Sequence, residues 1–139
     1  MSLYPNSERA RVRGCCTPIS GSQAAEALVT NWYHEHAVRL FEKHLHTCLT
    51  GCKLLAVRKS PRLTVRQMTR RWGSCTKAGN ISLNVDLIKT PIHCIDYVIV
   101  HELCHLKIHN HSQGFYRLLS QCMSDWGKRK ARLDSFRWE

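Results

Sequence analysis

The segment that most constrains the fold of this chain is residues 92–106, where apolar residues recur at helical spacing. The apolar positions are Ile92, Ile95, Ile99, Leu103 and Leu106. Thr90-Pro91 just before them is a typical helix start, because threonine caps helices well and proline is tolerated in the first turn. The pattern therefore predicts an amphipathic helix that must bury one face against the rest of a domain.

The predicted helix also carries the sequence His101-Glu102-Leu103-Cys104-His105. Residues four apart share one face of a helix, so the imidazoles of His101 and His105 can point toward one metal ion. Glu102 lies beside that face without being a ligand, and its carboxylate can take a proton from a water molecule that the metal activates. The pattern is short and recurs by chance, but the apolar side of the helix would keep such a site buried. We therefore expect a metal site with Glu102 as the catalytic residue.

A third ligand has to come from the chain beyond the helix. His111 lies six residues after the second histidine of the motif, which is the spacing of zinc sites of the HExxHxxxxxH type. A chain that turns away and returns a histidine surrounds an ion more easily than a helix continued to His109. We favour His111, with His109 as the alternative and Asp125 as a carboxylate option. Ile108 stands where such sites usually have glycine, so we expect a different turn, with Asn110 as the candidate for left-handed backbone.

Three histidines leave one coordination position open, which is the arrangement of catalytic rather than structural zinc sites. We predict one Zn²⁺ per chain, with nickel as a substitute, because imidazole ligands accept both ions. Arg70 and Arg71 could stabilise a developing oxyanion or bind a phosphate, the alternative being that both are solvated. Cys75 has no base partner in the sequence and is not predicted to be a nucleophile.

The remaining segments predict an α+β domain with a small sheet packed on helices. Helical periodicity runs from Ser22 to Leu49 and again from Ser112 to Trp126, after which a basic stretch follows. Extended segments are predicted at residues 53–58, 63–69 and 81–85, with a loop at residues 70–75. Residues 1–20 lack periodicity, so we expect an irregular lead-in followed by one domain over residues 21–139.

Charge and hydropathy restrict the partners. The net charge of +11 favours polyanions such as nucleotides or nucleic acid, the alternative being a solvated basic face. No apolar run reaches the ~20 residues of a membrane-spanning helix, and the start of the chain lacks a secretory pattern. We therefore expect a protein that is not exported and has no membrane contact.

The cysteines point to a reducing compartment. None of the eight forms a CxxC pair, so zinc ribbons and dithiol redox motifs are not supported. Free thiols in the cytoplasm are the expected state. His44, Cys48 and Cys52 follow one another at intervals of four in the first predicted helix, with His46 nearby, and we expect packing there rather than a second metal site.

Several segments together resemble the YgjP-like metal-dependent hydrolases, a family grouped with the zincin metallopeptidases and related to the SprT and WLM proteases. The resembling segments are Arg71-Trp72-Gly73-Ser74-Cys75, residues 79–84, residues 96–106, Asn110-His111-Ser112 and Phe115. The resemblance covers residues 22–139 and implies a zincin-like fold with His101, His105 and His111 as ligands and Glu102 as catalytic residue. Members usually begin with an additional β-rich segment, so we expect this chain to be N-terminally shortened or divergent.

Three functions remain open at this point. The first is a zinc metallopeptidase that cuts an amide bond in a peptide or protein, with the strand at residues 80–85 presenting an edge to the substrate. The second keeps the metal site but hydrolyses a nucleoside triphosphate, which the cations would bind. The third is a nucleic-acid-binding module with a structural zinc, or a DNA-associated protease, because SprT-type relatives act near DNA.

Overall fold

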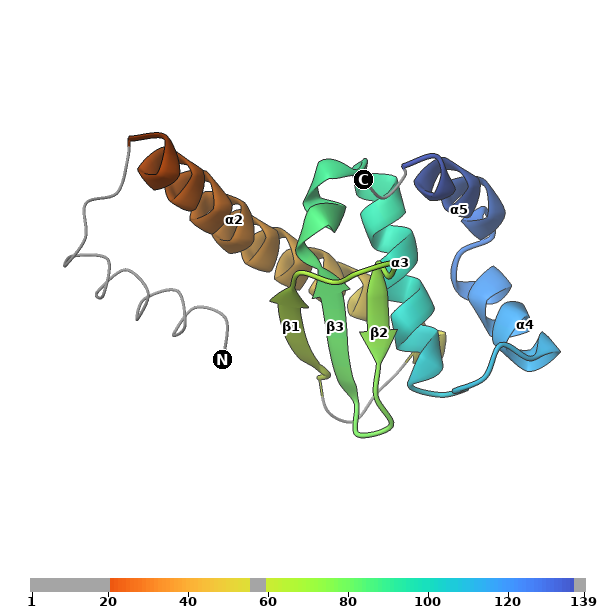
Figure 1. Ribbon diagram of the computed structural model, residues 1–139. Helices are drawn as coiled ribbons and strands as arrows, with labels where there is room; N and C mark the ends of the chain where they lie inside the picture. The colour runs from red at the N-terminus through yellow and green to blue at the C-terminus, as the bar shows by residue number, and fades with distance from the viewer. Residues whose placement is uncertain (1–20, 56–59, 137–139) are drawn as a thin grey trace.

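The computed structural model describes residues 21–55 and 60–136, and the fold is α+β as predicted (Figure 1). In chain order the elements are α2 (Gly21–Gly51), the 3-10 helix η1 (Lys53–Leu55), β1 (Arg62–Arg66), β2 (Gly73–Cys75), β3 (Asn80–Asn84), the 3-10 helix η2 (Val85–Lys89), α3 (Ile92–His105), α4 (Gln113–Cys122) and α5 (Trp126–Asp134). The lead-in predicted for residues 1–20 lies outside the described residues.

The three strands form one sheet in the order β1-β3-β2. β1 pairs with β3 in parallel, with Leu63 opposite Ile81 and Val65 opposite Leu83. β2 pairs with β3 in antiparallel, and the turn between them contains Gly79 at a φ of 93°. Because side chains alternate along a strand, the four apolar residues share one face of the sheet. α2 and α3 cover that face and lie behind the sheet in Figure 1.

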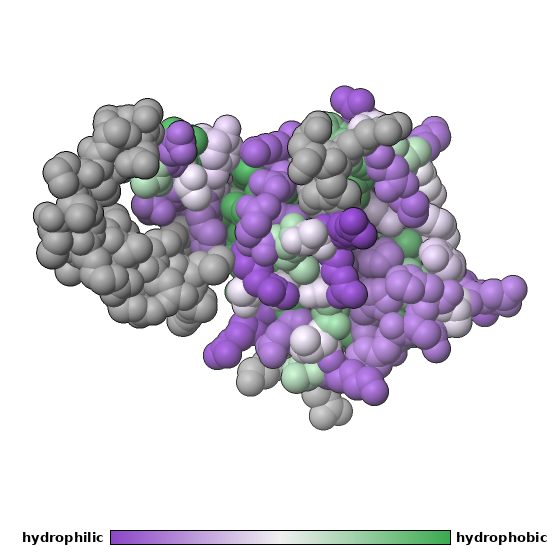
Figure 2. Space-filling model, in the orientation of Figure 1, coloured by the Kyte–Doolittle hydropathy of each residue, from purple (hydrophilic) through white to green (hydrophobic). Residues whose placement is uncertain are grey.

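The opposite face of the sheet is polar. Arg62, Arg66 and Asn80 point away from the helices and are exposed. Figure 2, drawn from this side, shows mostly hydrophilic residues over the front of the molecule. The sheet therefore buries one face only, which is common for small sheets with antiparallel pairing.

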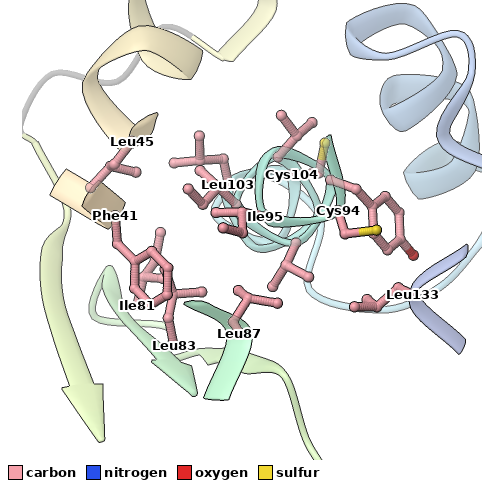
Figure 3. Close-up of a cluster of buried hydrophobic side chains, with 14 of the residues drawn as sticks. Phe41, Leu45, Ile81, Leu83, Leu87, Cys94, Ile95, Leu103, Cys104 and Leu133 are labelled. Atoms are coloured by element: carbon pink, nitrogen blue, oxygen red, sulfur yellow. The ribbon is translucent and has the colours of Figure 1, made fainter. Parts of the chain in front are cut away.

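α3 is the central element of the core. Ile95, Ile99 and Leu103 repeat every fourth residue and are each at most 1% exposed. Figure 3 shows side chains from the sheet and from other helices around α3, among them Phe41, Leu45, Ile81, Leu83 and Leu133. Ile92, which was expected in the same stripe, is 53% exposed because it lies in the first turn, at the margin of the core. The buried stripe fixes the rotation of α3 and thereby the direction of its histidines.

Three segments differ from the sequence-based expectation. Residues 53–55 form a 3-10 helix rather than a strand, because the Leu55 N–H bonds the Cys52 carbonyl 3.0 Å away and continues the helical winding. Residues 56–59, the rest of that expected strand, lie outside the described residues. Gly73–Cys75, expected in a loop, form β2 because β3 pairs with them. The helix expected over residues 112–126 ends at Cys122, and Trp126 begins a separate helix, α5, in which Leu133 is buried while Lys128, Lys130 and Arg132 are exposed.

α2 extends beyond the body of the molecule (Figure 1). Of its residues with described side chains, Ala37 is the first that is fully buried. Leu28, Val29 and Trp32 in its first half are exposed, although the periodicity predicted them to be inward. Within the described residues, none of the helices has the length and apolar character needed to cross a membrane.

Candidate metal centre

Three histidine side chains meet at the C-terminal end of α3. His101 and His105 lie one turn apart on this helix, and His111 comes from the loop that leads to α4. The His105 Nε2 lies 3.1 Å from the His111 Nε2, which in turn lies 3.3 Å from the His101 Nε2. All three ligand atoms are within 4.8 Å of one another. The same ring atom of each imidazole therefore faces a common point.

This spacing fits a metal ion. In a tetrahedral zinc site with Zn–N bonds of about 2.0–2.1 Å, two ligand nitrogens lie about 3.3 Å apart. A neutral imidazole has one N–H and one lone pair, so three converging nitrogens cannot all be satisfied by hydrogen bonds to one another. One cation at the common point would satisfy all three lone pairs. Among the described residues, no other group of three or more potential ligands comes this close.

Neighbouring groups orient the imidazoles. The Nδ1–H of His105 can donate to the Ile108 carbonyl oxygen, 3.0 Å away, which leaves the Nε2 lone pair free for a metal. The Tyr97 hydroxyl lies 3.5 Å from the His101 Nδ1. Tyr97 precedes His101 by one helical turn, so its position follows from the helix itself.

Phe115 supports all three rings. This residue of α4 is fully buried, and its ring stacks on His105 with centroids 4.4 Å apart. The centroids of His101 and His111 each lie 5.0 Å from the same ring. α4 therefore contributes an apolar wall against which the imidazoles are held.

Burial keeps His101 and His105, the two ligand histidines on α3, neutral. Desolvation, with smaller contributions from the neighbouring His105 and His111, lowers the pKa of His101 to about 4. Burial also lowers the pKa of His105. Neutral imidazole is the form that binds a metal, so the ligand state is already present at neutral pH.

Glu102 lies beside the histidine cluster in a nearly closed environment. Its side chain is on the side of α3 that faces β2, and the residue is 6% exposed. Desolvation raises the pKa of Glu102 to about 7, against a smaller lowering by the Arg71 guanidinium. A carboxyl group with a pKa near the working pH can both accept and return a proton.

Gly73 lets β2 approach this carboxylate. A Cβ at Gly73 would lie 3.2 Å from the Glu102 Oε2, 3.1 Å from the Ser82 carbonyl oxygen and 3.2 Å from Leu83 Cδ2. These distances are tighter than most Cβ contacts, so a larger residue would push the strand and the helix apart. The predicted loop glycine is therefore a contact residue of the site.

Asn84 fixes the segment that enters β2. This fully buried side chain donates to the carbonyl oxygens of Met68 and Arg71, at 3.0 and 2.8 Å, and accepts from the Asp86 N–H at 3.0 Å. Its own backbone N–H donates to the Trp72 carbonyl oxygen, 2.9 Å away. The side-chain N–H groups of Asn84 thus hold residues 68–71 against the end of β3, while its side-chain oxygen caps η2.

The histidines, Glu102 and β2 line a cavity of about 580 Å³. Arg71 lines this cavity, whereas Arg70 does not. The backbone of Arg70 is in the left-handed region, with a φ of 63°. Lys77 and Lys130 also line the cavity, and Lys130 is bonded to Asp134 at 2.8 Å. In the described part of the chain, Arg71 and Lys77 form no ion pair.

The alternative site residues are arranged differently. His109 lines the cavity but does not belong to the converging group. Asp125 binds Arg129 through an ion pair of 3.0 Å. Asn110 is not in the left-handed region; its Oδ1 accepts from the Ser112 N–H, 3.3 Å away, which shapes the turn without positive φ. Burial and the nearby Glu102 raise the pKa of Cys75 to about 11, so its thiol stays protonated.

The His/Cys group on α2 also does not form a metal cluster among the described residues. His44 Nδ1 lies 2.7 Å from the Asp96 Oδ1 and joins α2 to α3.

The sequence alone assigned no role in the site to Tyr97, Phe115, Lys77 or Lys130. Of these, Tyr97 had a local signal, since it precedes His101 by four residues. The others depend on how distant segments pack.

Comparison with known proteins gives two kinds of similarity. A family model described as YgjP-like, metallopeptidase domain, matches residues 8–136. Two crystal structures of metallopeptidase zymogens, abylysin of Pyrococcus abyssi and jannalysin of Methanocaldococcus jannaschii, are similar in fold, with TM-scores of 0.60 and 0.58. Both are 20% identical over 68% of this chain, and the matches cover 92% and 94% of those chains. No curated protein matches the sequence significantly.

Proposed function

Because the chain belongs to the YgjP-like metallopeptidase family, we propose that it hydrolyses peptide bonds with a zinc ion held by His101, His105 and His111 and with Glu102 as general base. Family membership makes it a metal-dependent hydrolase of peptidase type. The identity of the ion, the ligand set and the role of Glu102 are the proposed part. Zinc suits three imidazoles and an open position, and nickel can replace it.

One observation carries this proposal: three Nε2 atoms converge beside a buried carboxylate in an open cavity. A closed structural zinc site would use four protein ligands, usually including cysteines. Here the described residues offer three histidines, and the space next to them is lined by Glu102 and by β2. This arrangement leaves room for a substrate.

When bound, the zinc ion supplies Lewis-acid activation of a water molecule and of the substrate carbonyl. Glu102 accepts a proton from the attacking water at its carboxylate and then donates it to the nitrogen of the leaving amine. Burial raises the pKa of Glu102 in the metal-free site, which favours uptake of the proton by this carboxylate. Gly73 keeps the backbone of β2 close to this carboxylate.

β2 is the strand best suited to receive an extended peptide. The strand at residues 80–85 was expected to present its edge, but β3 is the central strand and pairs on both sides. Among the described residues β2 pairs with β3 alone, and all three of its residues line the cavity. A substrate that adds to β2 would therefore pass along the histidine cluster.

The Glu102→Gln variant tests the proposal. Glutamine keeps the shape and hydrogen bonding of the side chain but cannot accept a proton, so turnover of an unfolded protein substrate should fall by about 10² to 10⁴-fold. Metal content, measured by atomic emission, should stay at one ion per chain. Peptide hydrolysis that survives in Glu102→Gln would rule out Glu102 as the base.

A nucleoside triphosphate is the second candidate substrate. Arg71 and Lys77 line the cavity without an ion pair in the described residues, and such cations can bind phosphates. The same pair can also bind acidic peptides, so charge alone favours neither substrate class. The basic surface would attract nucleic acid on the same electrostatic grounds.

A further inference from the structure

A pair of thiols lies behind the metal-site helix, away from the proposed reaction. Cys52 directly follows α2, and Cys122 is the last residue of α4. The Cys52 thiol donates to the Cys122 Sγ, and the two sulfurs are 2.9 Å apart. Cys104 of α3 lies next to this pair and influences the pKa of the Cys122 thiol. Three elements that are distant in sequence thus bring their thiols together.

The two sulfur atoms of the Cys52–Cys122 pair are already close together. An S–S bond is about 2.05 Å long, so the two sulfurs need to approach by only about 0.9 Å. Cys52 and Cys122 are both half-buried and can meet a small reagent, whereas Cys104 is fully buried. The half-buried pair of Cys52 and Cys122, rather than a pair that includes Cys104, is therefore accessible to thiol–disulfide exchange.

We propose that Cys52 and Cys122 are a modification site, a dithiol that low-molecular-weight disulfides of the glutathione class oxidise to an intramolecular disulfide. Cys52 as thiolate attacks one sulfur of glutathione disulfide, which breaks that S–S bond and releases one glutathione thiolate. Cys122 as thiolate then attacks the Cys52 sulfur of the mixed disulfide and expels the second glutathione. Two protein thiols are oxidised, one glutathione disulfide is reduced to two glutathiones, and the two thiol protons pass to them.

The order of these steps follows from burial. Desolvation raises the pKa of the Cys122 thiol, which lowers its thiolate fraction and slows its attack on a disulfide. Cys52 forms the mixed disulfide, and closure by Cys122 is the slower step. In a reducing compartment the pair stays as thiols, and it closes when the oxidised form of glutathione accumulates.

The bond would connect α2 to α4 across α3. The two cysteines are 70 residues apart, and the enclosed segment contains the sheet, α3 and the whole histidine cluster. A loop of this length strongly restricts the unfolded chain. α4 also carries Phe115, whose ring contacts all three imidazoles, so the bond would keep α4 seated against them.

The experiment incubates the full chain with glutathione disulfide, blocks the remaining thiols and maps the product by tryptic mass spectrometry. Oxidation should remove two free thiols and join the peptides of residues 44–53 and 118–128. The midpoint of thermal unfolding should rise by about 10 °C or more over that of the reduced protein. Both changes should reverse with dithiothreitol.

Serine variants identify the partners, since Cys48 and Cys52 share one tryptic peptide. Cys52→Ser and Cys122→Ser should each lose the cross-link, and the matched control Cys48→Ser, one turn earlier on α2, should keep it. If a variant fails to fold, the cross-linked peptides of the oxidised wild type still test the proposal. A bond that contains Cys104, a product that stops at mixed disulfides, or oxidation without a rise in the unfolding midpoint would each overturn the proposal.

Discussion

His109 and His111 are two residues apart in the loop between α3 and α4, and both lie at the cavity. Only the ring of His111 reaches the point on which His101 and His105 converge. We expect His111→Ala to weaken zinc binding by more than about 100-fold, because even the loss of a supporting residue typically weakens binding 10- to 100-fold. His109→Ala should bind zinc almost as the wild type does. Competition with a chromogenic chelator measures both, and the opposite ranking would make His109 the ligand.

Glu102 should make the metal-free protein sensitive to pH. Burial raises its pKa from an ordinary value of 4.5 to about 7. Between these values the unfolded chain releases the proton and the folded protein retains it, so the free energy of unfolding falls as pH rises through this window. Above pH 7 the ionised, buried carboxylate destabilises the fold by about 3 kcal/mol at most.

The Glu102→Gln variant isolates this effect, since the histidines titrate in both proteins. At pH 8 and without metal, the variant should be the more stable protein, and near pH 4 the two should be equal. Urea unfolding of chelator-treated samples at a series of pH values gives the comparison. A difference that does not change with pH would mean that the carboxylate is solvated in the metal-free protein.

At the scale of elements, the spacing between β2 and α3 depends on Gly73. Gly73→Ala adds a Cβ 3.1 Å from a backbone oxygen and 3.2 Å from the Glu102 carboxylate, so either the strand or the carboxylate must shift. We expect kcat to fall by at least about tenfold while zinc binding is kept, because displacement of a catalytic group by a fraction of an ångström is costly. Gly127→Ala is the matched control, since its Cβ meets nothing within 4 Å and alanine favours the helix. Equal loss in both variants would point to general destabilisation.

The long helices could be predicted from local sequence patterns, whereas the short elements could not. α2 and α3 have many residues at helical spacing, so their positions were predictable within a few residues. β2 has three residues, and it exists because the backbone reverses at Arg70 and brings Gly73 opposite Leu83. No pattern in so short a segment indicates a strand. α5 was not predicted as a separate helix, because basic residues dominate its sequence and the buried Leu133 alone sets no apolar periodicity.

The same distinction applies to the candidate site. The positions of His101 and His105 on one face follow from helical geometry. The local spacing left His109 and His111 open, because the path of a loop depends on what it packs against. The wall formed by Phe115 and the contact of Gly73 with Glu102 join segments that are far apart in sequence. Such contacts arise from tertiary packing, which no local pattern records.

For the whole molecule, part of the net charge of +11 is located at the cavity. Lys130 is balanced by Asp134, whereas Arg71 and Lys77 lie on either side of β2 without an ion pair in the described residues. A peptide along β2 would therefore meet a cation near each end of its bound segment. Acidic side chains on the substrate would be attracted to both positions.

Matched peptides that differ only by Glu or Gln on both sides of the cleaved bond test this consequence. At low salt the acidic peptide should have a kcat/KM about 2- to 5-fold higher per acidic residue, the range expected of exposed ion pairs. The preference should shrink as salt rises toward 1 M, because the screening length then falls to about 3 Å. Lys77→Gln should remove part of it, and Lys43→Gln, on the exposed side of α2, should not. Equal rates for both peptides at every salt concentration would show that the cations do not contact the substrate. Hydrolysis of nucleoside triphosphates without any peptide cleavage, lost in Lys77→Gln, would instead assign the same cations to phosphate binding and favour the second candidate substrate.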